Sequence, residues 1–238
     1  MQTNFTLFLK LLFFSFFMTF HNYALSETIE KKIEDFLLNN PEVILKSLEN
    51  YEKKVERNEK LKTKKNIEFN QKTLLDSSNG LFSGNKSGSK VLIEFFDYNC
   101  TYCKKAHIDI KKLIANDPEV KIIYKNFPIL SEQSLKLSKI AVLLADKNTK
   151  LFNDFHNLVI EHRGIVDDEK VKKILLDLEL TPQEIFNDLK KEYLDNEIKK
   201  DVELAKVLGL KGTPVFVIND EIIFGYVGYD ELSSKLNF

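Results

Sequence analysis

The chain has 238 residues, of which 43% are hydrophobic and 30% are charged, and this composition is typical of a folded globular protein. The 35 basic and 36 acidic side chains leave a net charge of −1, so no global basic charge is present to hold nucleic acid. Arg57 and Arg163 are the only arginines, which further disfavours phosphate recognition. The Cys count of 2 excludes a disulfide-dense scaffold and a zinc site with four thiolates.

The first 26 residues have the pattern of a secretory signal peptide. Lys10 precedes the apolar run Leu11–Phe20. This run fits the apolar core of roughly 7–15 residues in such signals and is shorter than the roughly 20 residues that cross a bilayer. Small residues at Ala24 and Ser26 predict cleavage after Ser26 and export to the periplasm, an oxidising compartment. The alternative is an uncleaved anchor that extends back to Phe5.

Residues 27–80 are predicted to form an N-terminal helical arm. Asn40 and Pro41 interrupt the helical pattern, with Asn40 as the expected N-cap of the next helix and Pro41 at its first position. After this break, apolar residues recur at helical spacing, at Ile44, Leu48, Tyr51 and Val55. A narrow apolar stripe on a charged helix cannot form a core alone. We expect the arm to pack against copies of itself or against the following domain; the alternative is a solvated connecting helix.

The rest of the chain, residues 88–238, is predicted to be one α/β domain. Gly- and Ser-rich loops, Ser77–Gly80 and Ser83–Ser89, mark its boundary. Periodicity then predicts, in chain order, a buried strand over Val91–Phe96, a helix that starts near Cys100, a strand over Val120–Tyr124, a helical segment over about 131–207, a hairpin of Val215–Ile218 and Glu221–Phe224, and a final helix over Asp230–Leu236. This order indicates a small sheet with a helical insertion.

Cys100 and Cys103 lie three residues apart at the start of a predicted helix, directly after a predicted buried strand. A thiol at a helix N-terminus meets unpaired N–H groups and the positive end of the helix dipole, which lower its pKa. We expect Cys100 to be the exposed, reacting sulfur and Cys103 to be more buried. The pair can then alternate between dithiol and disulfide.

Other sites share this cysteine spacing. Half of a zinc site has it, but no second cysteine pair exists, and His107, His156 and His162 do not have a known ligand spacing. A structural disulfide is a second alternative, although closing so short a loop removes little chain entropy. The third alternative is a copper(I)-binding protein that uses the two thiolates as soft ligands. For the redox function we expect no bound metal and no organic cofactor.

Two separated motifs resemble the DsbA family of thiol–disulfide oxidoreductases. Glu94–Lys104 is similar to the active-site segment of that family, and Lys211–Val217 is similar to its cis-proline segment. Asn126–Ser131 and the helical segment after it resemble the helical insertion that separates DsbA-like proteins from thioredoxin. The N-terminal helices are similar to those of the ScsC and Com1-like branch, in which some members form trimers. The resemblance implies a thioredoxin-like fold with a helical insertion, and an exported thiol–disulfide oxidoreductase.

The resemblance also implies roles for single residues. Thr213 and Pro214 would form a cis peptide bond that faces Cys100 and binds an extended substrate segment; the alternative is a proline that starts an edge strand. Glu94 would be a buried acid that exchanges a proton with Cys103; the alternative is a carboxylate at the strand end that points into water.

Tyr98 and Tyr102 are expected to line a substrate groove, with core packing as the alternative, and His107 is expected on the helix surface. The two residues between the cysteines, Thr101 and Tyr102, depart from the Pro-His of DsbA, so its strong oxidising power does not carry over.

The expected partners follow from the same resemblance. Substrates would be exported proteins with cysteine pairs. A DsbB-like membrane protein would reoxidise an oxidase, whereas a DsbD-like membrane reductase would maintain an isomerase or reductase. The sequence leaves this direction open. It also leaves open whether the N-terminal helices form a homo-oligomer.

Overall fold

The computed structural model describes residues 28–237, so the predicted signal peptide lies outside the described residues. The chain divides into two units, with the division between Glu59 and Lys60. Among the residues described, no helix is both long and apolar enough to span a membrane.

The described part of the first unit, from residue 28 onward, is helical, as the sequence predicts. Residues 28–39 form a helix, and α2 (Pro41–Leu75) begins after a break at Asn40. The Asn40 side chain donates to the carbonyl of Phe36 at 2.8 Å, while its backbone carbonyl accepts the N–H of Val43 at 3.1 Å. Asn40 therefore contacts the helix on each side of the break. The apolar stripe of α2 is exposed within the single chain, at Ile44, Leu48, Tyr51 and Val55.

The second unit contains a five-stranded mixed sheet with the order β1-β3-β2-β4-β5. β2 and β3 are parallel, and the other neighbouring pairs are antiparallel. The strands are β1 (Phe82–Gly84), β2 (Lys90–Phe96), β3 (Val120–Asn126), β4 (Val215–Ile218) and β5 (Glu221–Phe224). The sequence prediction missed β1, because its Ser and Gly content is typical of a loop and the strand exists only by pairing with β3. β1 precedes residue 88, at which the sequence predicts the domain to begin, and its pairing with β3 makes it part of the same sheet.

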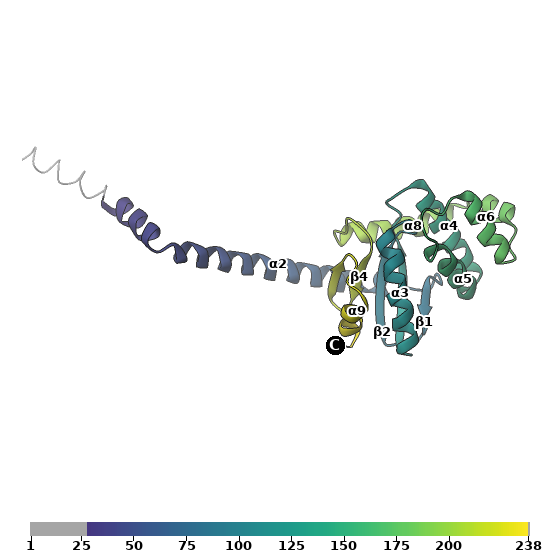
Figure 1. Ribbon diagram of the computed structural model, residues 1–238, viewed down its shortest axis with the longest axis horizontal. Helices are drawn as coiled ribbons and strands as arrows, with labels where there is room; N and C mark the ends of the chain where they lie inside the picture. The colour runs from purple at the N-terminus through teal and green to yellow at the C-terminus, as the bar shows by residue number, and fades with distance from the viewer. Residues whose placement is uncertain (1–27, 238) are drawn as a thin grey trace, which may run out of the picture. The chain divides into compact units, whose positions relative to one another are not determined.

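The helices of the second unit follow the order that the resemblance to DsbA-like proteins implies, with a helical segment inserted into the sheet domain. Figure 1 shows α4, α5, α6 and α8 gathered in a helical group beside the sheet. This group is the segment inserted between β3 and β4. The helices are α3 (Thr101–Asn116), α4 (Glu132–Lys147), α5 (Thr149–Ile160), α6 (Asp168–Asp177), α7 (Pro182–Asp188), α8 (Glu192–Val207) and α9 (Tyr229–Leu236).

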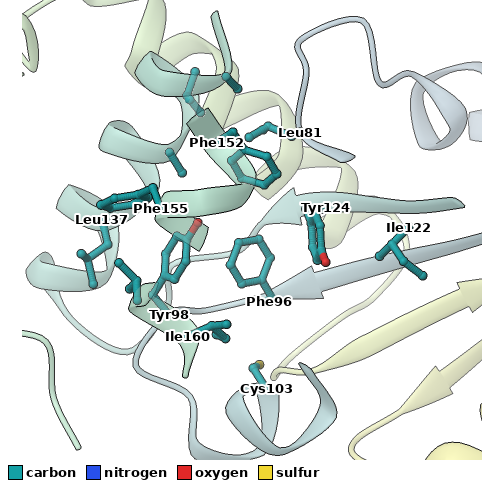
Figure 2. Packing of buried hydrophobic residues seen from close by; sticks show 14 of the residues in the cluster. Leu81, Phe96, Tyr98, Cys103, Ile122, Tyr124, Leu137, Phe152, Phe155 and Ile160 are labelled. Atoms are coloured by element: carbon teal, nitrogen blue, oxygen red, sulfur yellow. The ribbon is translucent and has the colours of Figure 1, made fainter. Parts of the chain in front are cut away.

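The two faces of the sheet belong to two hydrophobic cores, because side chains alternate along each strand. Ile93 and Phe95 of β2 face a core that also contains Ile67 and Leu74 from the end of α2. Phe96 faces the larger core, where it packs edge-on against Tyr98 and Tyr124 with ring centroids 4.9 and 5.6 Å away. Figure 2 shows these three rings side by side with Cys103 close below them. The first turn of α3 thus packs against the core of the sheet through Cys103.

Candidate active site

A tight turn after β2 places Cys100 at the N-cap of α3. Asp97 is buried, and its two carboxylate oxygens accept the N–H groups of Asn99 at 2.8 Å and Leu130 at 3.0 Å. The Cys100 N–H donates to the Asp97 carbonyl at 3.0 Å. Asp97 therefore fixes the loop that ends the strand and starts the helix. Sequence reasoning missed this residue, although an Asp at the end of a strand is a common signal for such a turn.

The surroundings of Cys100 favour its thiolate. The Cys103 N–H donates to Cys100 Sγ at 3.3 Å, as expected for an N-cap side chain. The hydrogen bond from the Cys103 side chain is the largest of the effects that lower the pKa of Cys100 to about 6, against the opposing effect of burial. Thr213 and the backbone of Tyr102 and Cys103 lower this pKa further. The side chain is 6% exposed, less than the sequence predicts, yet more than Cys103.

Cys103 has the opposite environment. Both cysteines are free thiols in this structure, and Cys103 is 0% exposed. Burial raises the pKa of Cys103 well above its ordinary value, and its hydrogen bond to Cys100 and the negative charges of Glu94 and Cys100 raise it further. One thiol is therefore poised to ionise and the other to stay protonated, as the sequence predicts for a reacting and a resolving cysteine.

Glu94 is a buried acid in the middle of β2. It is 3% exposed, and its neighbours in register are Tyr124 on β3 and Phe216 on β4. Burial raises the pKa of Glu94 to about 8, with a smaller contribution from the charge of Cys100. The alternative of a strand-end carboxylate in water is therefore wrong. A carboxyl group that is neutral at pH 7 can donate a proton.

The loop before β4 completes the site. The peptide bond between Thr213 and Pro214 is cis, as the resemblance implies. The Cys100 thiol donates to the Thr213 carbonyl at 3.3 Å, which places the loop directly against the sulfur. β4 lies between β2 and β5, so Pro214 does not start an edge strand. The two motifs, far apart in the sequence, therefore meet at one sulfur atom.

Two sequence predictions near the site are wrong. Tyr98 does not line a groove: it is buried, and its hydroxyl is 3.1 Å from Nδ1 of His156, a buried residue that sequence reasoning did not place near the site. His107 is not on the helix surface. It packs against His156 with ring centroids 5.3 Å apart, because α3 is covered by α5 as well as by the sheet. Tyr102, by contrast, is 61% exposed beside the cysteines.

Burial has a clear electrostatic effect on both histidines. It lowers the pKa of His107 to about 4 and that of His156 well below its ordinary value. His107 Nε2 is 3.5 Å from a carboxylate oxygen of Glu161, whose charge partly offsets the effect of burial. Both rings are therefore neutral at pH 7 and pack as part of the core.

The fold and the site together define a thioredoxin-like thiol–disulfide oxidoreductase. Its site has an activated thiol at Cys100, a buried thiol at Cys103, and a cis-proline loop that contacts the sulfur of Cys100. The comparison with known families agrees. Residues 91–237 match the family of DSBA-like thioredoxin domains. The chain belongs to this family.

Individual proteins of known name or structure are also similar to this chain. Disulfide bond formation protein D of Bacillus subtilis is 28% identical, over 64% of this chain and 73% of that protein. The thiol–disulfide exchange protein α-DsbA2 of Wolbachia pipientis is 30% identical, with a TM-score of 0.69, over 75% of this chain and 96% of that one. A linker-deletion variant of Proteus mirabilis ScsC, 24% identical, has the same fold with a TM-score of 0.70, over 90% of this chain and 94% of that one.

Proposed function

We propose that the protein is an exported dithiol oxidase. A substrate thiolate attacks Cys100 in the Cys100–Cys103 disulfide, and Cys103 leaves as a thiolate that takes up a proton. The second substrate thiolate then attacks the mixed disulfide, which forms the substrate disulfide and releases Cys100. Two electrons pass to the protein, and the protons of the substrate thiols pass to solvent and to Cys103.

The observation that carries this direction is the pKa of Cys100, which is lowered to about 6. A stabilised thiolate favours the dithiol form of the protein, and a couple whose reduced form is stabilised is the stronger oxidant. The lowered pKa of Cys100 does not require the Pro-His dipeptide of DsbA, because the groups that lower it are the Cys103 side chain, Thr213 and backbone N–H groups.

The reduction potential of the Cys100–Cys103 couple tests this direction. We expect equilibration with glutathione redox buffers to give a value less negative than about −270 mV, the potential of thioredoxin. The Cys100→Ser variant, which cannot form the disulfide, is the control for the signal. A value at or below that of thioredoxin would point instead to a reductase that is kept reduced by a DsbD-like partner.

Copper(I) binding by the two thiolates is the alternative function. It depends on the same two sulfur atoms, and nothing else in residues 28–237 favours it, since no group of three or more His, Cys, Asp or Glu residues there could hold a metal ion. We therefore carry only the redox function further.

The proposed oxidase acts in the periplasm on exported proteins with cysteine pairs, and a DsbB-like membrane protein would return it to the disulfide form. The signal-peptide pattern of residues 1–26 supports this location. A periplasmic thioredoxin-like protein from Salmonella enterica serovar Typhimurium, 27% identical with a TM-score of 0.63, is among the similar structures.

We further propose that the N-terminal helices join copies of this chain. Several large apolar side chains of the first unit are exposed in the single chain, among them Ile29, Leu38, Leu45 and Tyr51. The stripe of α2 has the alternating spacing by which helices pack against one another. An identical helix offers a matching apolar surface, and its burial removes these side chains from water.

Deletion of residues 27–59 tests this assembly. The deletion stops before Ile67 and Leu74, because both are buried in the second unit. We expect light scattering to give an oligomer for the mature chain and a monomer for the shortened chain. A monomeric mature chain would contradict the proposed assembly without affecting the redox function.

A further inference from the structure

A groove of about 990 Å³ begins beside the reacting cysteine. Asn99 and Thr101, the residues on either side of Cys100, line one end of it. From there it follows the outer face of α3, with residues 160–165, at the end of α5 and in the loop after it, as the opposite wall. This volume is large enough for several residues of an extended peptide or for a drug-sized ligand.

The wall opposite α3 is held in place by one lysine. The ammonium group of Lys104 on α3 donates to the backbone carbonyls of His162 at 2.8 Å and Gly164 at 2.6 Å. These charge-assisted hydrogen bonds join two segments that are far apart in the sequence. The groove is therefore formed before any ligand is bound.

The charged groups that line the groove are mainly cationic. Lys111 pairs with Glu161, the only carboxylate among the lining residues, at 2.6 Å. Lys112 is 3.3 Å from a carboxylate oxygen of Asp109. Three cations have no ion pair with any residue in the range 28–237: Lys104, Lys105 and Arg163. The ammonium group of Lys105 lies over the ring of Tyr226, 4.4 Å from its centroid, which leaves its charge without a carboxylate partner. The groove thus carries an uncompensated positive charge, although the chain as a whole has a net charge of −1.

The groove is also lined by exposed apolar side chains. Ile108 on α3 and Ile165 in the facing loop both line it, and they are 56% and 75% exposed. Exposed isoleucines next to cations that lack a carboxylate partner suit a ligand with both acidic and apolar groups.

We propose that this groove binds an acidic segment of the substrate chain next to its reacting cysteine. The proposal rests on the proposed oxidase function and names its substrate class. A substrate cysteine must reach Cys100, so the residues beside that cysteine come to Asn99 and Thr101, where the groove begins. The carboxylates of the segment then meet Lys105 and Arg163, and its apolar side chains meet Ile108 and Ile165.

Two matched dithiol peptides test the proposal. They share one cysteine pair and one length, and differ only in carrying Asp and Glu or Lys and Arg beside the cysteines. We expect the oxidised full-length mature protein to react about tenfold faster with the acidic peptide at low ionic strength, and the difference to shrink as salt screens the charges.

The variant Arg163→Glu should remove most of this preference, since the Arg163 side chain is exposed and has no hydrogen bond or ion pair with the described residues. Lys105→Gln should weaken the preference by a smaller factor. It provides a second test of the groove if Arg163→Glu does not fold. The matched control is Lys86→Glu, the same change of charge in the exposed turn before β2, at the opposite end of that strand from Cys100.

Exchange of the wild-type protein with dithiothreitol, which carries no charge, separates the two proposals. Normal exchange with dithiothreitol and equal rates for the two peptides would overturn the groove proposal and leave the oxidase function intact. An equal loss of preference in Lys86→Glu and Arg163→Glu would also overturn it, because the preference would then come from the overall charge. Failure to exchange with dithiothreitol would overturn the proposed function itself.

Discussion

Replacement of Cys103 by alanine is expected to trap substrates on Cys100 as mixed disulfides, whereas replacement of Cys100 by alanine traps none. Cys100 is the more accessible sulfur, and its pKa is about 6. At pH 7 this pKa keeps about 90% of the thiol ionised, compared with about 3% for an ordinary cysteine with a pKa of about 8.5. Cys103 is fully buried, and its pKa is raised well above the ordinary value.

The two variants differ because only Cys103 can resolve the mixed disulfide from within the protein. Without it, the Cys100 thiolate attacks a substrate disulfide in the reverse of the last step of the proposed oxidation. The substrate S–S bond breaks, the other substrate sulfur leaves as a thiolate, and the adduct on Cys100 persists. The loss of the Cys103 side chain also removes the main effect that lowers the pKa of Cys100, so the adduct should form more slowly than attack on the same substrate disulfide by the Cys100 thiolate of the reduced wild-type protein.

The measurement is non-reducing gel electrophoresis of each variant after expression with its native exported proteins, followed by mass spectrometry of the adducts. Catalysed turnover should fall to the uncatalysed background in both variants. Adducts on Cys103 in the Cys100→Ala variant, with none on Cys100 in the Cys103→Ala variant, would mean that the roles of the two sulfurs are reversed.

Local patterns in the sequence predict the centre of the site well. The strand that ends at Phe96, the turn and the start of α3 are consecutive in the chain, so their geometry depends on neighbouring residues. The resemblance adds the cis peptide bond at Pro214 and the burial of Glu94. The hairpin of β4 and β5 is also correctly predicted, because Asn219 and Asp220 mark its turn.

The features that the sequence did not predict depend on contacts between distant segments. β1 is a strand only through its pairing with β3. His107 is polar and lies on the turn of α3 after Cys103, but α5 covers it, and no local pattern indicates which helix will pack there. The groove beside Cys100 depends on the hydrogen bonds between Lys104 and the loop after α5. Its cations are spread over two segments whose sequences show no joint pattern.

Replacement of Glu94 by glutamine is expected to raise the stability of the reduced protein at pH 7 while it slows exchange. The pKa of Glu94 is raised to about 8 in the folded state, whereas it is close to 4.5 in the unfolded chain. Between these two values the folded state binds more protons than the unfolded state, so the free energy of unfolding falls as pH rises. By pH 7 this linkage lowers the stability of the wild-type protein by about 3 kcal/mol.

Glutamine has the same shape and stays neutral, so the variant should lack this pH dependence. Urea unfolding from pH 4.5 to 8 should give similar stabilities for both proteins at the acid end and a difference of about 3 kcal/mol near pH 7. Other groups that titrate in this range, such as Asp201, are common to both proteins and cancel in the difference. The control is Glu184→Gln, the same change at an exposed position of α7, where we expect a difference below about 0.5 kcal/mol.

The effect of Glu94→Gln on the exchange rate shows whether Glu94 donates a proton to the Cys103 thiolate. When a substrate thiolate attacks Cys100, Cys103 leaves as a buried thiolate, and the charge of Glu94 acts on it strongly enough to raise its pKa. A protonated Glu94 can neutralise that thiolate, whereas glutamine cannot, so the exchange rate at pH 7 should fall by about 10²-fold. The wild-type rate should also decline above pH 8, where Glu94 ionises, and the variant should lose this decline. If stability rises while rate and pH profile remain those of the wild-type protein, Glu94 is not the proton donor and only destabilises the core.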